Sequence, residues 1–165
     1  MVNMVATTAA ASPLFLRESE VRRGMELLYF GYSQLTKSVD AQLAEMGLGR
    51  AHHRVLYFVA RQPDLSVTQL LGLLSITKQS LGRVLNELVD RGLIEMRQGE
   101  RDRRQRLLRL SAEGRTLEAA LFEQVRAQLA EAYKAAGQTA VGGFWSVLEN
   151  LIPEPERPRV MALRS

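Results

Sequence analysis

The chain of 165 residues is long enough to bury a core without disulfides, and its 24% charged residues and net charge of +4 are ordinary for a globular protein. It contains no cysteine, which excludes a disulfide framework, a thiolate nucleophile and a cysteine-based redox sensor. The two histidines, His52 and His53, are adjacent, and neighbouring helical residues point about 100° apart, so we predict no metal site, no cofactor and no catalytic site.

The N-terminal residues are mildly apolar but lack the basic start and the continuous apolar stretch of a signal peptide. No uncharged apolar run approaches the ~20 residues that a membrane-spanning helix needs. We therefore expect a loose arm over residues 1–17, no membrane partner and a cytoplasmic protein.

Two helices are predicted before Pro63. Apolar side chains recur every three or four residues over 18–46, which is typical of one face of a long helix. Gly47 and Gly49 end this helix, and a second one follows until Gln62, the residue before the proline.

Two shorter helices with recognisable N-terminal caps come next. Ser66 and Gln69 have the spacing of a capping box, which predicts a helix to about Leu74. Thr77 caps the following helix, and Gly92 ends it. Its apolar positions repeat with helical spacing and should face the core: Leu81, Val84, Leu85 and Leu88.

The pattern then changes to a hairpin and returns to helices. The segments LIEMRQ and QRLLRLS flank a charged turn that begins at a glycine, and they predict a β-hairpin. Ser111 caps a long helix that Gly137 interrupts, and a final helix ends before Pro153. We expect no regular structure in the proline-rich tail, 153–165.

This order of elements is the layout of a winged helix-turn-helix, with a helix for the major groove and a hairpin wing beside it. Nine basic and five acidic residues lie between Lys78 and Arg109, so the excess positive charge is local. Such a cluster favours a polyanion partner, although a solvated basic face explains charge alone equally well. The sequence thus predicts a mainly α fold with a small β-hairpin wing.

The polar face of the fourth helix is the candidate reading surface. Gln79 is suited to adenine and Arg83 to guanine or phosphate, whereas the short hydroxyls suit phosphates. The alternative is an ordinary solvated face. The candidate DNA-binding residues on this helix are Thr77, Lys78, Gln79, Ser80 and Arg83.

The hairpin turn is the second candidate contact. Its crowded arginines repel one another unless an anion is near, and Asp102 is placed to hold one guanidinium. Basic tips also suit a narrow minor groove. The candidates here are Arg101, Asp102, Arg103, Arg104 and Arg106.

The run LSVTQLLGLLSITKQSLGRVLNELVDRGLIEMRQGERDRRQRLLRLSAEG resembles the DNA-binding core of the MarR family of bacterial regulators. The D-x-R wing motif of that family is present as Asp102-Arg103-Arg104, and its L-[ST]-x-x-G motif as Leu110 to Gly114. The likeness extends over about 18–152. Gly49 departs from the pattern, because the family usually has Ser or Thr at this cap.

The resemblance implies a role for several residues and an assembly. Arg104 corresponds to the minor-groove arginine and Asp102 to its orienting partner. The family also implies a homodimer built from the first and last helices, and exposed apolar stripes on these helices need a partner surface in any case. The expected division is a helical dimerisation region, 18–49 and 111–152, and a winged helix-turn-helix lobe, 50–110.

We therefore predict a transcription regulator, a ligand-responsive repressor that binds a pseudo-palindromic operator in double-stranded DNA as a homodimer. The alternative is a winged-helix module for protein interaction, whose wing would be neutral or acidic. A membrane-surface protein ranks last, since the basic cluster is mostly hairpin.

A small aromatic or anionic effector is the third expected partner, because aromatic walls with polar tips suit such a ligand. The resemblance places the first two helices beside a ligand cleft, although aromatic residues there fill core space equally well. The candidates are Tyr29, Tyr32, His52, His53 and Tyr57.

Overall fold

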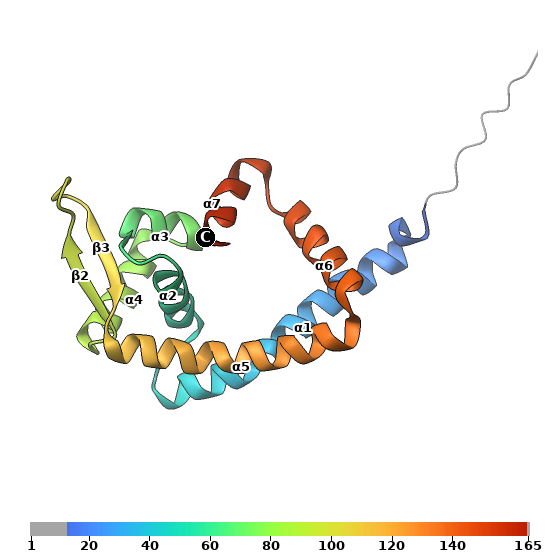
Figure 1. The fold of residues 1–165 in the computed structure, drawn as a ribbon, viewed down its shortest axis with the longest axis horizontal. Helices are drawn as coiled ribbons and strands as arrows, with labels where there is room; N and C mark the ends of the chain where they lie inside the picture. Colours follow the sequence, from blue (N-terminus) through green and yellow to red (C-terminus); the bar gives the residue numbers. More distant parts are fainter. Residues whose placement is uncertain (1–12, 165) are drawn as a thin grey trace, which may run out of the picture. The chain divides into compact units, whose positions relative to one another are not determined.

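The computed structural model describes residues 13–164, so most of the expected N-terminal arm lies outside the described residues. The chain divides into two units, Met1–Thr36 and Lys37–Ser165, which meet within one long helix and are described separately. In chain order (Figure 1) the elements are η1 (Leu14–Leu16), α1 (Glu18–Glu45), α2 (Arg50–Arg61), β1 (Leu65–Ser66), α3 (Val67–Leu74), α4 (Lys78–Asp90), β2 (Ile94–Gln98), β3 (Arg106–Leu110), α5 (Ala112–Ala136), α6 (Gln138–Leu151), η2 (Glu154–Glu156), α7 (Arg157–Met161) and η3 (Ala162–Arg164).

The first unit consists of η1 and most of α1, and its large apolar side chains are exposed. Met25 is 68% exposed and Phe30 is 66% exposed. Helices that are stable in water normally bury an apolar stripe. Among the described helices, none has both the length and the apolar character to cross a membrane.

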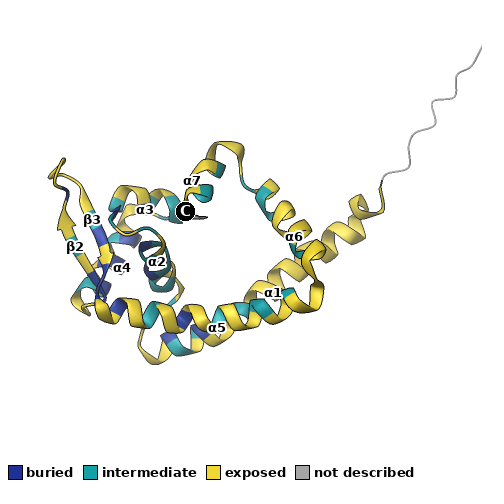
Figure 2. Cartoon of the chain, in the orientation of Figure 1, coloured by how far each residue is buried: buried dark blue, intermediate teal, exposed yellow. Residues whose placement is uncertain are grey.

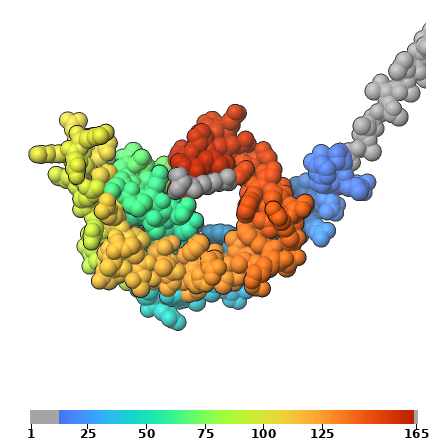
Figure 3. Space-filling model, in the orientation of Figure 1, coloured from blue at the N-terminus to red at the C-terminus, as the bar shows by residue number. Residues whose placement is uncertain are grey.

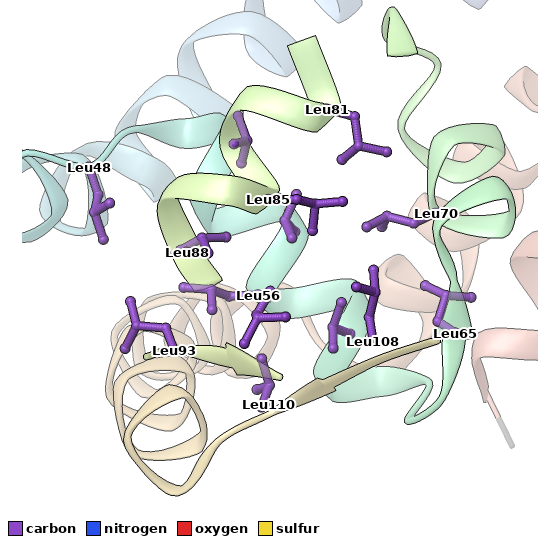
Figure 4. Packing of buried hydrophobic residues seen from close by; sticks show 14 of the residues in the cluster. Leu48, Leu56, Leu65, Leu70, Leu81, Leu85, Leu88, Leu93, Leu108 and Leu110 are labelled. Atoms are coloured by element: carbon purple, nitrogen blue, oxygen red, sulfur yellow. The ribbon is translucent and has the colours of Figure 1, made fainter. Parts of the chain in front are cut away.

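The core of the second unit lies among α2, α3, α4 and the strands (Figure 4), which bring together leucines from widely separated segments. Leu56 of α2, Leu70 of α3 and Leu88 of α4 are completely buried. The apolar positions of α4 follow the helical spacing that the sequence predicted, and all four face this core. Figure 2 shows the contrast with α6, in which no residue is buried.

The sheet has three antiparallel strands in the order β1-β3-β2. The predicted hairpin is present as β2 and β3, with Ile94 opposite Leu110. The sequence did not predict β1, a two-residue strand that pairs Leu65 with Leu108, because two residues carry no detectable alternation. The fold class, mainly α with a small β wing, is confirmed.

Local sequence signals placed the element boundaries well. The hydroxyl oxygens of Ser66, Thr77 and Ser111 each accept a hydrogen bond from the N–H three residues later, as the caps predicted. Gly92 has a φ of 68° just beyond α4, a conformation that glycine adopts without steric cost.

The expectation of an irregular tail was wrong. Residues 154–164 form the short helices η2, α7 and η3. Pro155 and Pro158 lie in the first turn of η2 and of α7, where the missing N–H is not needed and the fixed φ favours the helix. The prolines therefore start helical turns here.

Candidate nucleic-acid interface

The N-terminal half of α4 presents an exposed polar surface. The Thr77 Oγ1 accepts a hydrogen bond from the Ser80 N–H (3.1 Å) and donates one to the Ser80 Oγ (2.8 Å). Lys78, Gln79 and Arg83 are all exposed, since the core takes the opposite face of the helix. The five predicted residues of this helix therefore lie together at its start.

The tip of the wing, the turn 99–105 together with Arg106 at the start of β3, is shaped by its backbone. A side chain at Gly99 would place Cβ only 2.7 Å from the Asp102 carbonyl oxygen, so the turn requires glycine. The Gly99 N–H donates to the Gln105 carbonyl, and the Gln105 N–H donates to that of Asp102, each at 3.0 Å. The resulting turn projects from the second unit (Figure 3).

Asp102 has a different partner from the one that the sequence analysis expected. Its Oδ1 accepts the backbone N–H of Arg104 at 2.9 Å, and no ion pair with a guanidinium is found among the described residues. An Asp that bonds the backbone two residues later closes an Asx-turn. Asp102 therefore orients Arg104 through the main chain in this structure, and the guanidinium is left exposed.

The base of the wing, which we define as Asp64, Arg97 and Arg109, is arranged very differently. The Asp64 carboxylate accepts from Arg97 at 2.9 Å and from Arg109 at 2.5 Å, so it joins β2 to β3. Hydrogen bonds from Arg109 and then Arg97 lower the pKa of Asp64. Asp64 has a φ of 67°, and its backbone N–H donates a hydrogen bond to the Leu108 carbonyl at 3.0 Å.

The structure therefore sorts the basic cluster into two groups. Arg97 and Arg109 pair with Asp64, and Arg91 pairs with Glu87 at 2.9 Å. Within the described part of the chain, six others have no acidic partner: Lys78, Arg83, Arg101, Arg103, Arg104 and Arg106. These are the cations that remain available to an external anion.

A hollow of about 920 Å³ lies between α3, α4 and the wing. Lys78, Arg104 and Arg106 contribute positive charge to it, and polar groups from α3 complete its lining. Thr68, Gln69 and Gln105 were not predicted from the sequence, because only the folded chain brings α3 and the wing tip beside α4. The other polar lining residues are Ser66, Asn86 and Asp102.

The far end of α4 is fixed by a hydrogen-bonded network. The His52 Nδ1 accepts the Gly49 N–H at 3.1 Å, which is the bond from the third helical residue back to the N-cap in a capping box. The His52 Nε2 lies 2.9 Å from Glu87, and hydrogen bonds from His52 and then Arg91 lower the pKa of Glu87. Arg91 in turn donates to the Met46 carbonyl at 2.6 Å. His52 thus acts as a structural residue in this arrangement.

The other effector candidates are distributed over both units. Tyr29 and Tyr32 are 69% and 50% exposed in the first unit. In the second, burial lowers the pKa of His53, and the Tyr57 ring lies 6.4 Å from that of Phe122. The hollow beside α4 is lined by other residues, so it is not the predicted effector site. No cluster of three potential metal ligands occurs among residues that the structure describes.

Comparison with known proteins identifies the family. The sequence profile of the MarR family matches residues 46–105, which include the α3–α4 pair and most of the wing. The chain is also 44% identical over 151 residues to the HTH-type transcriptional regulator PetP of Rhodobacter capsulatus, covering 92% of this chain and 91% of PetP. The chain belongs to the MarR family.

Two solved structures have the same fold as this chain. FabT of Streptococcus pneumoniae, solved in complex with DNA, aligns with a TM-score of 0.70 at 20% identity, over 79% of this chain and 94% of FabT. A mutant of E. coli MarR in complex with operator DNA aligns with a TM-score of 0.64 at 21% identity, over 86% of this chain and 100% of MarR. This MarR-family chain therefore shares their architecture, and the predicted family is confirmed.

Proposed function

We propose that this MarR-family protein is a repressor that binds double-stranded operator DNA as a homodimer and responds to a small ligand. The single observation that carries DNA binding is the group of six unpaired cations on α4 and the wing tip. Three of them line the hollow beside α4: Lys78, Arg104 and Arg106. Two structural relatives were solved in complexes with DNA, which supports the same partner here.

The geometry is suited to two kinds of DNA contact, one from α4 to bases and one from the wing to the minor groove or phosphates. A helix with an exposed polar N-terminal half can enter the major groove, where Gln79 and Arg83 reach base edges. The projecting wing tip then brings Arg104 to the neighbouring minor groove or phosphates. We assign base reading to α4 and electrostatic anchoring to the wing.

The decisive test is the salt dependence of duplex binding. If each dimer neutralises about six to ten phosphates, affinity falls by on the order of 10³ to 10⁵ between 50 and 200 mM salt. Fluorescence anisotropy with a labelled duplex measures this slope directly. A protein-interaction module, the competing function, would show no salt-dependent binding of duplex, and that result would replace the proposal.

A homodimer is proposed from the exposed apolar helices, each considered within its own unit. In α1, Met25 and Phe30 are exposed, and in α6 Trp145 and Leu151 are 51% and 66% exposed. Such surfaces normally mark a protein interface. We therefore assign dimerisation to 18–49 and 111–152, and reading to 50–110.

Symmetry makes the dimer testable. A two-fold dimer presents two copies of α4 to successive major-groove faces, so the operator is a pseudo-palindrome with half-sites roughly 10 bp apart. Light scattering gives the mass, and selection from a random duplex library gives the site. A monomer at micromolar concentration or an asymmetric selected site would contradict this assembly.

The proposed effector contacts are Tyr29 and Tyr32 of the first unit and His52, His53 and Tyr57 of the second. His52 is also hydrogen-bonded to Gly49 and Glu87. A phenolic or carboxylate compound that binds the free dimer more tightly than the DNA complex lowers DNA affinity by the same factor. Tyr32→Ala should reduce both effects equally. A broad screen in which no compound releases DNA or shifts the melting temperature would remove ligand control and leave DNA binding standing.

A further inference from the structure

The C-terminal residues Pro153–Leu163 connect two elements that are far apart in the sequence. They leave the end of α6 and lie beside α3 (Figure 1). Arg159 forms a hydrogen bond with α3, and the Leu163 carbonyl accepts one from α2. We propose that this segment, the C-terminal strap, ties α6 to α3 and fixes the separation of the two reading helices in the dimer. This inference rests on the proposed DNA-binding function.

The near end of the strap is fixed to α6 by one arginine. The Arg157 Nε donates to the Ile152 carbonyl at 3.0 Å, and its Nη2 lies 3.5 Å from Asn150 Oδ1. Ile152 and Pro153 have extended backbones, and the Glu156 N–H donates to the Pro153 carbonyl at 2.9 Å. The turn after α6 therefore has a defined direction.

The far end is fixed to the helix-turn-helix by two more arginines. Arg159 donates to the Gly72 carbonyl in the last turn of α3. Arg61, the last residue of α2, donates to the Leu163 carbonyl. The final carbonyls of a helix lack partners within it and carry partial negative charge, so a guanidinium there is favourable. Val160 and Met161 are half-buried, which is consistent with a docked segment.

Gly72 has a specific part in this contact. A Cβ at this position would lie 2.8 Å from the Arg159 Nη1, closer than real atoms approach. Gly72 lies inside α3, in its last turn, where glycine is less favourable than alanine. A side chain at this position would make the flexible end of Arg159 shift away from the backbone of α3.

The mechanical consequence concerns the dimer. If α6 belongs to the dimer interface and α3 braces α4, the strap is a third connection between interface and reading lobe, in addition to α5 and the junction between α1 and α2. A further connection restricts rotation of the lobe about the other two. The half-site spacing that the dimer accepts should therefore be narrower with the strap docked than with it released.

The first part of the test uses the full-length protein without DNA. Hydrogen exchange followed by mass spectrometry reports whether the amides of residues 156–163 are protected. Arg159→Ala and Gly72→Ala should each speed their exchange by about threefold to tenfold, the effect of losing one hydrogen bond. Gly72→Ala is informative because alanine favours the α3 helix while its Cβ displaces the arginine. Arg159→Lys should restore part of the protection.

The second part measures spacing tolerance. The probes are a duplex selected with the wild-type protein and two derivatives with one base pair added or removed between half-sites. For each protein, discrimination is the ratio of its affinity for the selected duplex to its affinity for an altered one. In the strap variants this ratio should be about threefold to tenfold smaller than in the wild type. Arg17→Ala is the control, because Arg17 is an exposed arginine outside both the dimerisation regions and the reading lobe. It should leave both exchange and spacing preference unchanged.

The outcomes separate the two proposals. A wild-type protein that binds no duplex overturns the proposed function, whatever the exchange data show. Tail amides that exchange equally fast in wild type, Arg159→Ala and Gly72→Ala overturn the docking of the strap. Slowed exchange in the wild type with unchanged spacing discrimination in both variants overturns its positioning role.

Discussion

The base and the tip of the wing carry the same kind of charge and use it differently. At the base, Arg97 and Arg109 share the carboxylate of Asp64, which joins the two strands to the end of α2. At the tip, the arginines from Arg101 to Arg106 are exposed and have no acidic partner among the described residues. A count of basic residues therefore overestimates the binding surface, and pairing within the fold decides which cations face an external anion.

The largest expected effect is loss of a tip arginine. Arg104→Ala should weaken duplex binding by about 10-fold to 100-fold per subunit and lower the salt slope, because one charge contact is removed from each half-site. Arg109→Ala is the control, since it removes the same charge from the base. Equal losses in both variants, measured by anisotropy at several salt concentrations, would contradict the distinction between base and tip.

Substitutions on α4 should change sequence preference as well as affinity. Gln79→Ala should cost roughly 1–3 kcal/mol at the base pair it reads and little elsewhere, because a bidentate contact discriminates between bases. Lys78→Ala should weaken all duplexes by a similar factor, as expected for a phosphate contact. Binding to single-base operator variants separates the two. If Gln79→Ala also weakens every duplex equally, Gln79 contacts the backbone.

A change at the base should affect stability more than DNA binding. Asp64→Asn keeps a residue that tolerates the φ of 67° but removes the charge that Arg97 and Arg109 share. The melting temperature should fall, while operator affinity should change by less than about tenfold. Thermal melts measure the melting temperature, and fluorescence anisotropy on the same preparation measures operator affinity. A loss as large as that of Arg104→Ala would show that the base also orients the tip.

The smallest expected effect is a difference in acid stability. The pKa of Asp64 is lower in the folded protein than in the unfolded chain, because Arg109 and Arg97 bond its charged form. Its stabilisation is therefore complete above the unfolded pKa of about 4 and is lost as the pH falls through the lower folded pKa. The melting temperatures of wild type and Asp64→Asn should converge over this acidic range. Curves that stay parallel down to the lowest measurable pH would exclude this linkage.

The sequence alone determined the features that depend on near neighbours. The caps at Ser66, Thr77 and Ser111 and the glycine after α4 satisfy backbone groups within a few residues, so their signals are readable from spacing. The buried face of α4 follows from a 3.6-residue period for the same reason. These local signals, with the wing motif, sufficed for the fold class and the family.

Only the tertiary structure decided which side chains are free. Asp64 lies 33 residues from Arg97 and 45 residues from Arg109 in the sequence, and no local pattern predicts that these residues pair. The hydrogen bond between His52 and Glu87, 35 residues apart, is likewise not indicated by any local pattern. The tail was wrongly expected to be irregular, since Arg159 finds its acceptor at Gly72, 87 residues earlier. A charged side chain takes the nearest partner in space, and that distance is set by packing of the whole core rather than by position along the chain.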